Sequence, residues 1–502
     1  MILSIYCGPH TGSITVIDNG KIIYYSQEEQ FTTLKHDKSV WCSLLDIDKK
    51  FDHFDLVVLN SLYPEEWIPD RDVFRLRRLF ENNLLNFTYK DFIFNNETHH
   101  LYHAILGFYH SGFDKALCVV LDGHGAITEE GRESGSIILA EQPDIFSDKY
   151  KRWCPISNGT DEFYRTHGHQ CKSSGWIYEE ATYKIENWTW ESAGKLMGLA
   201  ECKGYEDLIE DKWKRHIDFA YTTHKRAEQN AIELIDKALT YDDTDNIVLS
   251  GGYFLNCVSN YEFLAKFPDK NIFVEPIGFD AGMSMGQAFY YNPPKEIKEV
   301  NNIYYGYNDH DYSLLKDYQT WTVSYADVVN FLMNKNIVAI FQGGVEAGPR
   351  ALGNRSLLFD PRDPNGKEIV NTVKKRESFR PFAGAILEED VHDWFDTRGL
   401  DKSPFMMYAM NCKQREKIPA VLHYNGTSRI QTVSSEHNYH FYNLIREFYF
   451  RTGVPILLNT SFNLAGWPIV MDIKQAINTL ENSLIEYLYI PEENKLVVIK
   501  ND

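Results

Sequence analysis

Residues 2–29 read ILSIYCGPHTGSITVIDNGKIIYYSQEE, and this stretch indicates the class of fold. It contains three short runs rich in β-branched and aromatic residues, and Asp18-Asn19-Gly20 joins the second and third runs as a strong hairpin signal. A helix is predicted at 225–240. Further strands are predicted at 55–60, 116–122, 135–141, 246–252 and 271–276. Strands that alternate with helices predict an α/β protein whose ligands bind at the carboxyl ends of the strands.

The composition predicts two or three domains. The chain has 502 residues, of which 43% are apolar, so it has enough apolar material for real cores. Residues 291–320 are polar, rich in Pro, Asn and Tyr, and without period, so the domain boundary is expected near 300–315. The net charge of −20 argues against a protein that coats nucleic acid over its whole surface, although it allows a local basic groove.

The eight cysteines are scattered, and several lie in apolar strands, which predicts reduced thiols in an intracellular, cytoplasmic protein. A zinc site is a weaker alternative reading, because its residues lack the paired CxxC form. Its ligands would be Cys154, His167, His169 and Cys171. No apolar run approaches ~18 residues and no leader is visible, so no membrane association is expected.

A candidate metal site is spread over three segments. His99 and His103 are four residues apart in ETHHLYHAILGFY, whose apolar spacing suits a helix, so both rings project from one face. Asp122 ends the apolar strand ALCVVLD, and Asp280 follows the strand NIFVEP. Two histidines with two carboxylates suit a divalent transition metal such as iron, with manganese or zinc as alternatives.

Glycine-rich turns provide candidate nucleotide contacts. Gly8 and Gly12 flank His10 in a hairpin turn where the backbone can approach a ligand. SGGYFLN (250–256) joins a buried strand to a helix, and GKLMGLAECKG (194–204) forms another tight stretch. The candidate residues in these two stretches are Lys195, Gly198, Gly251, Gly252 and Asn256.

The clearest local anomaly is a basic region in an acidic chain, GPRALGNRSLLFDPRDP (348–364) followed by VKKRESFRPFAG (373–384). Its cations are Arg350, Arg355, Arg362, Lys374, Lys375, Arg376 and Arg380. Arg429, Ser461 and Asn463 supply further polar groups at predicted strand ends. Guanidinium groups bind oxyanions through paired hydrogen bonds, so a phosphate or carboxylate-like ligand is predicted. The alternative is that these cations pair with carboxylates of the chain.

The chain resembles the O-carbamoyltransferases of the nodulation, cephalosporin and aminoglycoside-antibiotic type. The resemblance lies in GPHTGSITVIDNGKI, HHLYHA, VVLDGHG, AGKLMGLA, LSGGYFLN, FDAGMSMGQA, GPRALGNRSLLFDPRDP, VKKRESFRPFAG, TSRIQTV and TGVPILLNTSFNLAGWPIV. These stretches span almost the whole chain in order. There are two departures: Glu201-Cys202-Lys203-Gly204 replaces the usual PYG-like ending after MGLA, and RPFAG replaces RPFAP.

The resemblance implies a TsaD-like domain of the actin/sugar-kinase superfamily over residues 1–305 and a YrdC-like domain over 306–502. The second domain would make carbamoyl-adenylate from carbamoyl phosphate and Mg²⁺-ATP. The first would transfer the carbamoyl group to a hydroxyl, with an Fe²⁺-type metal on His99, His103, Asp122 and Asp280 and with His10 as acid/base. The carbamoyl phosphate and ATP pocket would consist of Arg350, Arg355, Lys374, Arg376, Arg380, Arg429, Ser461 and Asn463.

The acceptor stays open. Acceptors in the family include sugars, lipo-oligosaccharides, antibiotic hydroxymethyl groups and, for phage-borne relatives, hydroxymethylated pyrimidines such as 5-hydroxymethylcytosine in DNA or its nucleotide. Arg71, Arg75 and Arg78 on one predicted helical face are compatible with phosphate contacts, although a solvated helix face is the plainer reading. Two other functions are a threonylcarbamoyl-type tRNA-modifying enzyme and a catalytically silent binding module. A homodimer is a candidate assembly.

Overall fold

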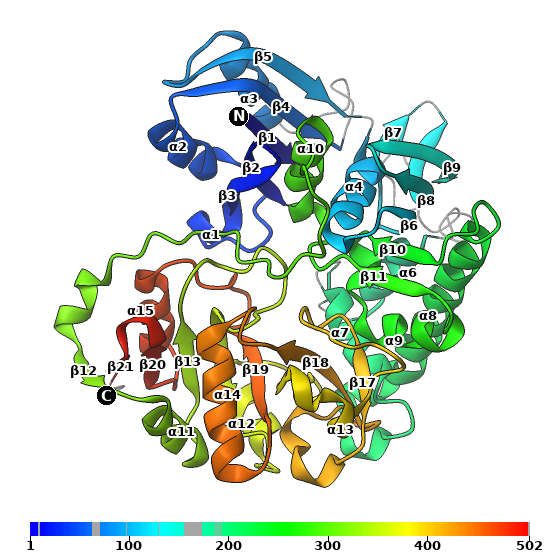
Figure 1. Cartoon of the computed structure of the whole chain (residues 1–502). Coiled ribbons are helices and arrows are strands. Elements are labelled where there is room, and N and C mark those ends of the chain that lie inside the picture. Colours follow the sequence, from blue (N-terminus) through cyan, green and yellow to red (C-terminus); the bar gives the residue numbers. More distant parts are fainter. Residues whose placement is uncertain are drawn as a thin grey trace. The chain divides into compact units, whose positions relative to one another are not determined.

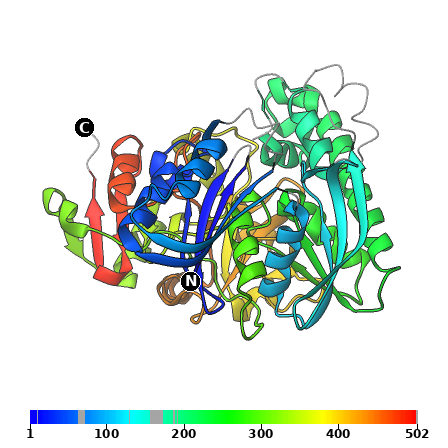
Figure 2. The ribbon, with the colours of Figure 1, turned by 90° about the horizontal axis from the view of Figure 1, so that it is seen from above.

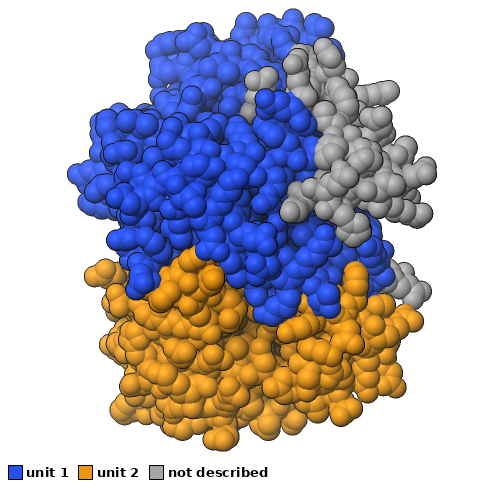
Figure 3. All heavy atoms as spheres, turned by 90° about the vertical axis from the view of Figure 1, so that its right-hand side faces the viewer, with its two compact units in different colours: residues 1–196, 222–255, 269–300 blue, residues 197–221, 256–268, 301–502 orange. Residues whose placement is uncertain are grey.

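The computed structural model describes residues 1–8, 11–62, 71–96, 98–128, 130–154, 173–185, 188–189 and 192–499. They form two compact units (Figure 3). Unit 1 consists of residues 1–196, 222–255 and 269–300, and unit 2 of residues 197–221, 256–268 and 301–502. Among the described helices, none has the length and apolar character needed to cross a membrane.

The first sheet of unit 1 is built from the stretch that opens the chain (Figure 1). Its strands are β1 (Ile2–Cys7), β2 (Gly12–Asp18), β3 (Lys21–Gln27), β4 (His53–Ser61) and β5 (Thr88–Asn95). The spatial order is β3-β2-β1-β4-β5: the first three strands are antiparallel neighbours, and β4 and β5 run parallel to β1. Helices α1 (Glu28–Thr32), α2 (Trp41–Lys50) and α3 (Arg71–Glu81) occupy the connections.

The second sheet of unit 1 repeats this topology. It contains β6 (Lys115–Val120), β7 (Ile127–Thr128), β8 (Gly131–Glu141), β9 (Ile145–Cys154), β10 (Asn246–Ser250) and β11 (Asn271–Val274). Apart from the short β7, the order is β9-β8-β6-β10-β11, again with three antiparallel neighbours followed by two parallel strands. This duplicated strand order confirms the predicted α/β class and the actin/sugar-kinase fold of the N-terminal part.

Two helices pack as a pair between these sheets (Figures 1 and 2). Helix α4 (His99–Ser111) packs on β6, β8 and β10, whereas α10 (Met283–Tyr291) packs on β1 and β2. The two helices approach so closely that a Cβ at Gly286 would lie 2.1 Å from the carbonyl oxygen of Tyr102. Only glycine fits there, because a real Cβ would have to displace backbone.

Gly286→Ala is therefore expected to separate α10 from α4 and to weaken metal binding, since three of the four candidate ligands lie on α4 or just before α10. We expect the metal affinity to fall about 10–100-fold, as when residues that support metal ligands are replaced. Calorimetric metal titration measures this. Gly194→Ala, at an exposed helical glycine with nothing near its Cβ position, is the control and should leave the affinity unchanged.

Unit 2 contains a mixed sheet of ten strands, so the C-terminal part is also α/β. The strands are β12 (Gln319–Thr322), β13 (Val338–Phe341), β14 (Arg355–Phe359), β15 (Ala383–Leu387), β16 (Phe395–Asp396), β17 (Ala409–Cys412), β18 (Thr427–Val433), β19 (Ile456–Ser461), β20 (Tyr487–Ile490) and β21 (Lys495–Val498). Their order is β12-β21-β20-β13-β14-β19-β15-β18-β17-β16. Its helices include α11 (Tyr325–Met333), α12 (Gly366–Val373), α13 (Val391–Trp394), α14 (Tyr439–Thr452) and α15 (Ile473–Glu481).

Unit 2 also takes in two segments that the sequence reading placed in the first domain, 197–221 and 256–268. Within the second segment, helix α9 (Cys257–Lys266) packs on β17, and the Tyr261 hydroxyl donates to the carbonyl oxygen of Asp396 over 2.8 Å. A single division near residue 305 does not describe these units, because contacts of this kind join residues far apart in the chain.

Candidate metal centre and cation cluster

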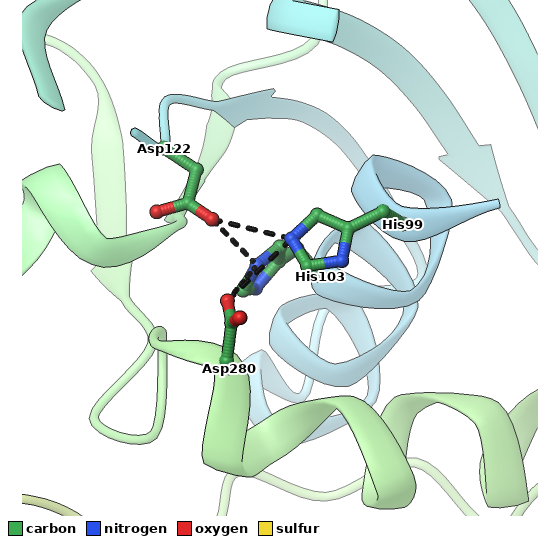
Figure 4. A group of neighbouring side chains, drawn as sticks. All are labelled: His99, His103, Asp122 and Asp280. Atoms are coloured by element: carbon green, nitrogen blue, oxygen red, sulfur yellow. Dashed lines mark hydrogen bonds and ion pairs between the residues drawn. The ribbon is translucent and has the colours of Figure 1, made fainter. Parts of the chain in front are cut away.

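Four side chains that the sequence singled out come together in unit 1, and we call them the metal centre (Figure 4). His99 and His103 project from one face of α4, Asp122 follows β6, and Asp280 begins the short turn that leads into α10. The Nε2 atom of His99 lies 3.2 Å from Oδ2 of Asp122 and 3.5 Å from Oδ1 of Asp280. The corresponding distances for His103 are 3.5 and 3.9 Å.

This arrangement fits a metal ion. Ligand atoms about 2.1 Å from one ion lie about 3.0–3.4 Å apart in tetrahedral or octahedral geometry, close to the separations found here. The Nε2 atom of His103 is buried and has no hydrogen-bond partner among the described residues, which suits a lone pair reserved for a metal. The site is also enclosed, because His99, His103 and Asp280 are at most 3% exposed.

The charges within the centre stabilise one another. Burial raises the pKa of Asp122, but the adjoining His103 and His99 side chains outweigh it and hold the pKa well below its usual value. Burial lowers the pKa of His99, yet the charges of Asp280 and Asp122 raise it above its ordinary value. The Asp122 carboxylate therefore stays ionised, as a metal ligand must be.

Neighbouring groups fix the orientation of both carboxylates. The Tyr6 hydroxyl on β1 donates to Oδ2 of Asp280 over 2.8 Å, and the Gly252 amide donates to Oδ1 of Asp122 over 3.2 Å. Gly251 has φ +102° and would place a Cβ 2.2 Å from the carbonyl oxygen of Leu121. The sequence predicts that this glycine turn binds a phosphate. In the structure the Gly252 amide is hydrogen-bonded to Asp122, a candidate metal ligand.

The other predicted nucleotide contacts have local roles. The Asn256 side chain caps α9 by accepting from the amides of Val258 and Ser259. Lys195 on α7 (Ala193–Ala200) lies over the Trp188 ring at 5.8 Å. Gly198, on the same helix, would place a Cβ 3.4 Å from Pro381. Nucleotide binding by these residues stays a prediction.

Some predicted residues lie outside the described part of the chain. These are the candidate acid/base His10 and three members of the alternative zinc set, His167, His169 and Cys171. The fourth member, Cys154, is buried in contact with Trp176. On α3, Arg75 and Arg78 are exposed, and the Arg78 guanidinium lies over Phe74.

Unit 2 contains a second group, which we call the cation cluster. It consists of Arg350, Lys374, Arg376, Arg380 and Arg429. Arg350 lies between β13 and β14, Lys374 caps α12, and Arg429 lies on β18. An ion pair between described residues involves the cluster: Glu377 Oε2 lies 3.8 Å from Nη1 of Arg380. Cations gathered in this way are expected to attract an anion.

The pKa values of these cations are lowered because they are buried close to one another. Burial, followed by the charges of neighbouring arginines, lowers the pKa of Arg350 to about 9 and that of Arg376 to about 9. Burial and then Arg376 and Arg380 lower the pKa of Lys374 well below its usual value. An anionic ligand would relieve this repulsion, so the cluster gains free energy by binding one.

Ser461 and Asn463 lie beside the cluster, and their contact with a ligand stays a prediction. Lys374 Nζ donates to the backbone oxygens of both residues and to Oδ1 of Asn463, the latter over 3.0 Å. The Ser461 hydroxyl is 3.4 Å from Nη2 of Arg376. The strand registers place Arg429, Ala383 and Asn459 side by side on β18, β15 and β19, so Arg429 projects from the sheet face that carries these polar groups.

Two arginines of the basic region have structural roles instead. Arg355 is fully buried: it lies 3.8 Å above the Phe341 ring and donates to the carbonyl oxygens of Gln342, Gly343, Asn354 and Met471. Arg362 forms a bidentate ion pair with Asp360. Pairing within the protein thus explains Arg362, and the prediction that Arg355 contacts ligand is not supported, because its donors are already used.

Arg355→Met should consequently destabilise the protein rather than affect ligand binding alone. The substitution leaves several buried carbonyls without donors, which costs roughly 3 kcal/mol or more and should lower the melting temperature by several degrees. Differential scanning fluorimetry measures this. Arg380→Met is the matched control in the cation cluster, where losing a like charge should leave stability unchanged or raise it. Equal losses in both variants would contradict the structural role of Arg355.

The sequence reading missed two members of this neighbourhood, Lys367 and His423. Lys367 lies seven residues before Lys374 on α12, a spacing that places both on one helix face. The charges of Lys367 and Arg429 both act on the buried ring of His423. The helical spacing could have predicted that Lys367 lies near Lys374. The position of His423 depends on a turn that the sequence pattern does not predict.

Two family models and several known proteins match this chain. Residues 176–289 match the family model "Carbamoyltransferase N-terminus" and residues 329–497 match "Carbamoyltransferase C-terminus". An uncharacterised protein of Methanocaldococcus jannaschii is 29% identical, with 95% of this chain and 96% of that protein covered. The nodulation protein NolO of Bradyrhizobium diazoefficiens is also 29% identical, with coverages of 78% and 77%. Nodulation protein U of the same organism is 31% identical, with coverages of 44% and 39%.

Solved structures give weaker likenesses. HypF of T. kodakarensis has a TM-score of 0.39 and 16% identity over 58% of this chain and 47% of that one. The ROK hexokinase of Thermus thermophilus has a TM-score of 0.34 and 11% identity over 58% and 97%. Because these TM-scores are low, the fold assignment follows from the strand orders described above.

The chain belongs to the carbamoyltransferase family, whose two models together match more than half of its residues. It is an enzyme of that family and is related to the nodulation proteins NolO and U.

Proposed function

We propose that this carbamoyltransferase is an ATP-dependent O-carbamoyltransferase that makes carbamoyl-adenylate from carbamoyl phosphate and ATP and passes the carbamoyl group to an acceptor hydroxyl. The observation that carries the proposal is the buried cation cluster, whose members lower one another's pKa, since both co-substrates are phosphate anions. Membership of the carbamoyltransferase family supports carbamoyl transfer as the reaction.

The proposed reaction balances over three steps. Water cleaves carbamoyl phosphate to carbamate and phosphate. A carbamate oxygen then attacks the α-phosphorus of ATP, and pyrophosphate leaves. Finally the acceptor oxygen attacks the carbamoyl carbon, its proton passes to a base, and AMP leaves. The arginines and Lys374 neutralise the phosphate oxygens during the first two steps, when charge develops on the leaving groups.

The metal centre has a donor set that fits a divalent ion, proposed to be Fe²⁺, with Mn²⁺ and Zn²⁺ as alternatives. His99, His103, Asp122 and Asp280 would hold it, and a bound ion would supply Lewis-acid neutralisation of phosphate charge. Tyr6 and the Gly252 amide hold the two carboxylates in place for it. His10 is the proposed base for the acceptor hydroxyl, whose own pKa is far above 7.

The test is to incubate the protein with ATP, Mg²⁺ and carbamoyl phosphate and to measure pyrophosphate and AMP. We expect pyrophosphate only when carbamoyl phosphate is present, because adenylate formation requires both co-substrates. Release that is independent of carbamoyl phosphate would contradict the proposal. A parallel incubation with threonine, bicarbonate and tRNA tests threonylcarbamoyl transfer, which requires isotope from threonine to enter the tRNA.

The acceptor is best identified by mass. Carbamoylation adds one carbamoyl group to a sugar, an antibiotic hydroxymethyl group or 5-hydroxymethylcytosine in DNA or nucleotide, and each acceptor can be offered separately. DNA that contains hydroxymethylcytosine is compared with plain DNA: both are incubated with the enzyme, digested to nucleosides and analysed by mass. The exposed Arg75 and Arg78 are the motive for including DNA.

A further inference from the structure

His423 has an unusual environment for a histidine. Its side chain is buried, with the residue only 6% exposed, and its Nε2 atom has no hydrogen-bond partner among the described residues. The residue begins a tight turn in which its amide donates to the carbonyl oxygen of Thr427 over 2.7 Å, immediately before β18. Lys367, whose Nζ lies 4.6 Å from the centre of the Tyr424 ring, occupies the other side of this turn. The charge of Arg429, a member of the cation cluster, acts on the His423 ring, which links this histidine to the cluster.

A chain of hydrogen bonds fixes which ring nitrogen carries the proton. Glu201 accepts from the Asn425 side-chain amide, so the Asn425 Oδ1 atom is the one that faces Thr427. The Thr427 hydroxyl donates to that Oδ1 over 2.8 Å. Since its one proton is used there, the Thr427 oxygen must accept from Nδ1 of His423, 3.0 Å away. Nε2 is then left unprotonated, as a hydrogen-bond acceptor.

The ring keeps this form over the working pH range. Burial, together with the charges of Lys367 and Arg429, lowers the pKa of His423 to about 3. A neutral imidazole thus presents a lone pair near two cationic hydrogen-bond donors, Lys367 and Arg429. The Nε2 atom of His423 can therefore accept a hydrogen bond from a ligand that carries an N–H or O–H donor close to its anionic part.

We propose that Nε2 of His423 accepts a hydrogen bond from the amino group of the carbamoyl unit and so makes this site select carbamoyl phosphate over acyl phosphates that lack an N–H. The inference rests on the proposed function. Carbamoyl phosphate is the co-substrate that carries an amide donor directly beside a phosphate, whereas acetyl phosphate replaces that amino group by a methyl group of similar size.

Glu201 helps to fix the tautomer of His423, because it orients the Asn425 amide that accepts from Thr427. It is one of the positions at which the sequence departs from the PYG-like ending of the family that it resembles. Glu201, Asn425 and Thr427 are positioning residues here, because they act through His423 rather than on the ligand. Without the Thr427 hydroxyl, the ring is free to protonate either nitrogen, and part of the population would offer a donor instead of an acceptor.

The experiment measures KM for carbamoyl phosphate in pyrophosphate release and Ki for acetyl phosphate as its competitor. In the wild type the ratio Ki/KM should be about 100 or more, since a site built to bind an N–H rejects an analogue without it. His423→Leu should lower the ratio about 30-fold, mainly by raising KM, because the amino group then loses its partner. His423→Gln, which keeps an acceptor, should restore part of the ratio, and Thr427→Val should give an intermediate value.

His392→Leu is the matched control, because His392 is exposed and its Nδ1 also faces a threonine hydroxyl, that of Thr397 at 3.3 Å. It should leave the ratio unchanged. An unchanged ratio in His423→Leu, with KM and Ki raised by the same factor, would overturn the inference. If 2′-deoxy- or 3′-deoxy-ATP abolishes the difference between wild type and His423→Leu, Nε2 binds a ribose hydroxyl instead, which also overturns it.

The two proposals fail in different ways. Absence of pyrophosphate from the wild-type protein would refute the proposed function. Calorimetric dissociation constants for carbamoyl phosphate and acetyl phosphate would still test selection by His423, because they require no turnover. Should His423→Leu not fold, the same constants for His423→Gln and Thr427→Val decide the matter: a ratio equal to that of the wild type in Thr427→Val would contradict the role of the tautomer.

Discussion

Arg429→Ala should abolish adenylate formation, lowering the rate of pyrophosphate release by about 1,000-fold or more, an effect of roughly 4 kcal/mol on the barrier. Its Nε atom is buried without a partner among the described residues, and its charge acts on Arg350, Arg376 and Arg380. Removing it takes away a cation whose charge acts on the other three arginines of the cluster, at the site proposed to bind phosphate. Pyrophosphate release with saturating carbamoyl phosphate is the measurement.

The metal content of Arg429→Ala should equal that of the wild type, because the four candidate ligands all belong to the other unit. Its melting temperature should stay the same or rise, since a like charge has been removed from a crowded site. Arg362→Ala is the matched control: it lies in the same basic region, but its guanidinium is already paired with Asp360. Parallel loss of metal in Arg429→Ala would contradict the division into two sites.

His103→Ala should have the opposite pattern. The substitution removes an imidazole that projects from α4. Its Nε2 lies 3.5 Å from Asp122 Oδ2 and 3.9 Å from Asp280 Oδ1. We expect bound metal to fall to background and carbamoyl transfer to fall about 1,000-fold or more, while carbamoyl phosphate-dependent pyrophosphate release continues. Elemental analysis of the purified protein and acceptor mass spectrometry measure the two quantities.

His53→Ala provides the control for His103→Ala. His53 is an exposed residue of the same unit, with Nδ1 2.8 Å from the Thr88 hydroxyl, and its loss should change neither metal content nor transfer. Retention of full metal content by His103→Ala would remove this residue from the ligand set. Loss of pyrophosphate release together with metal would show that adenylate formation also requires the metal centre.

Much of this architecture could be predicted from local sequence. The hairpin signal at Asp18-Asn19-Gly20 gave β2 and β3 correctly, and the predicted strands at 55–60 and 135–141 lie within β4 and β8. The pairing of His99 with His103 followed from helical periodicity alone. Their meeting with Asp122 and Asp280 was predicted because carboxylates at strand ends gather at one edge of a sheet.

The failures have a common physical cause. Arg355 and Arg429 look alike in sequence, yet only the structure shows that the first is surrounded by carbonyl oxygens and the second by cations. Gly252 looked like a phosphate cradle because a glycine turn does not reveal what its amide faces. His423 was missed since its role depends on a proton position set by Glu201, more than two hundred residues earlier. Partners from distant segments leave no local signature.

The interleaving of the two units limits how the chain can be divided. A cut near residue 300 would leave the C-terminal fragment without α9, so the backbone groups of Asp396 and Met407 would lose the Tyr261 and Asn260 side chains that now donate to them. It would also leave Asn425 without Glu201. Exchange of whole halves between relatives should therefore yield insoluble or inactive hybrids, unless residues 197–221 and 256–268 travel with the C-terminal half.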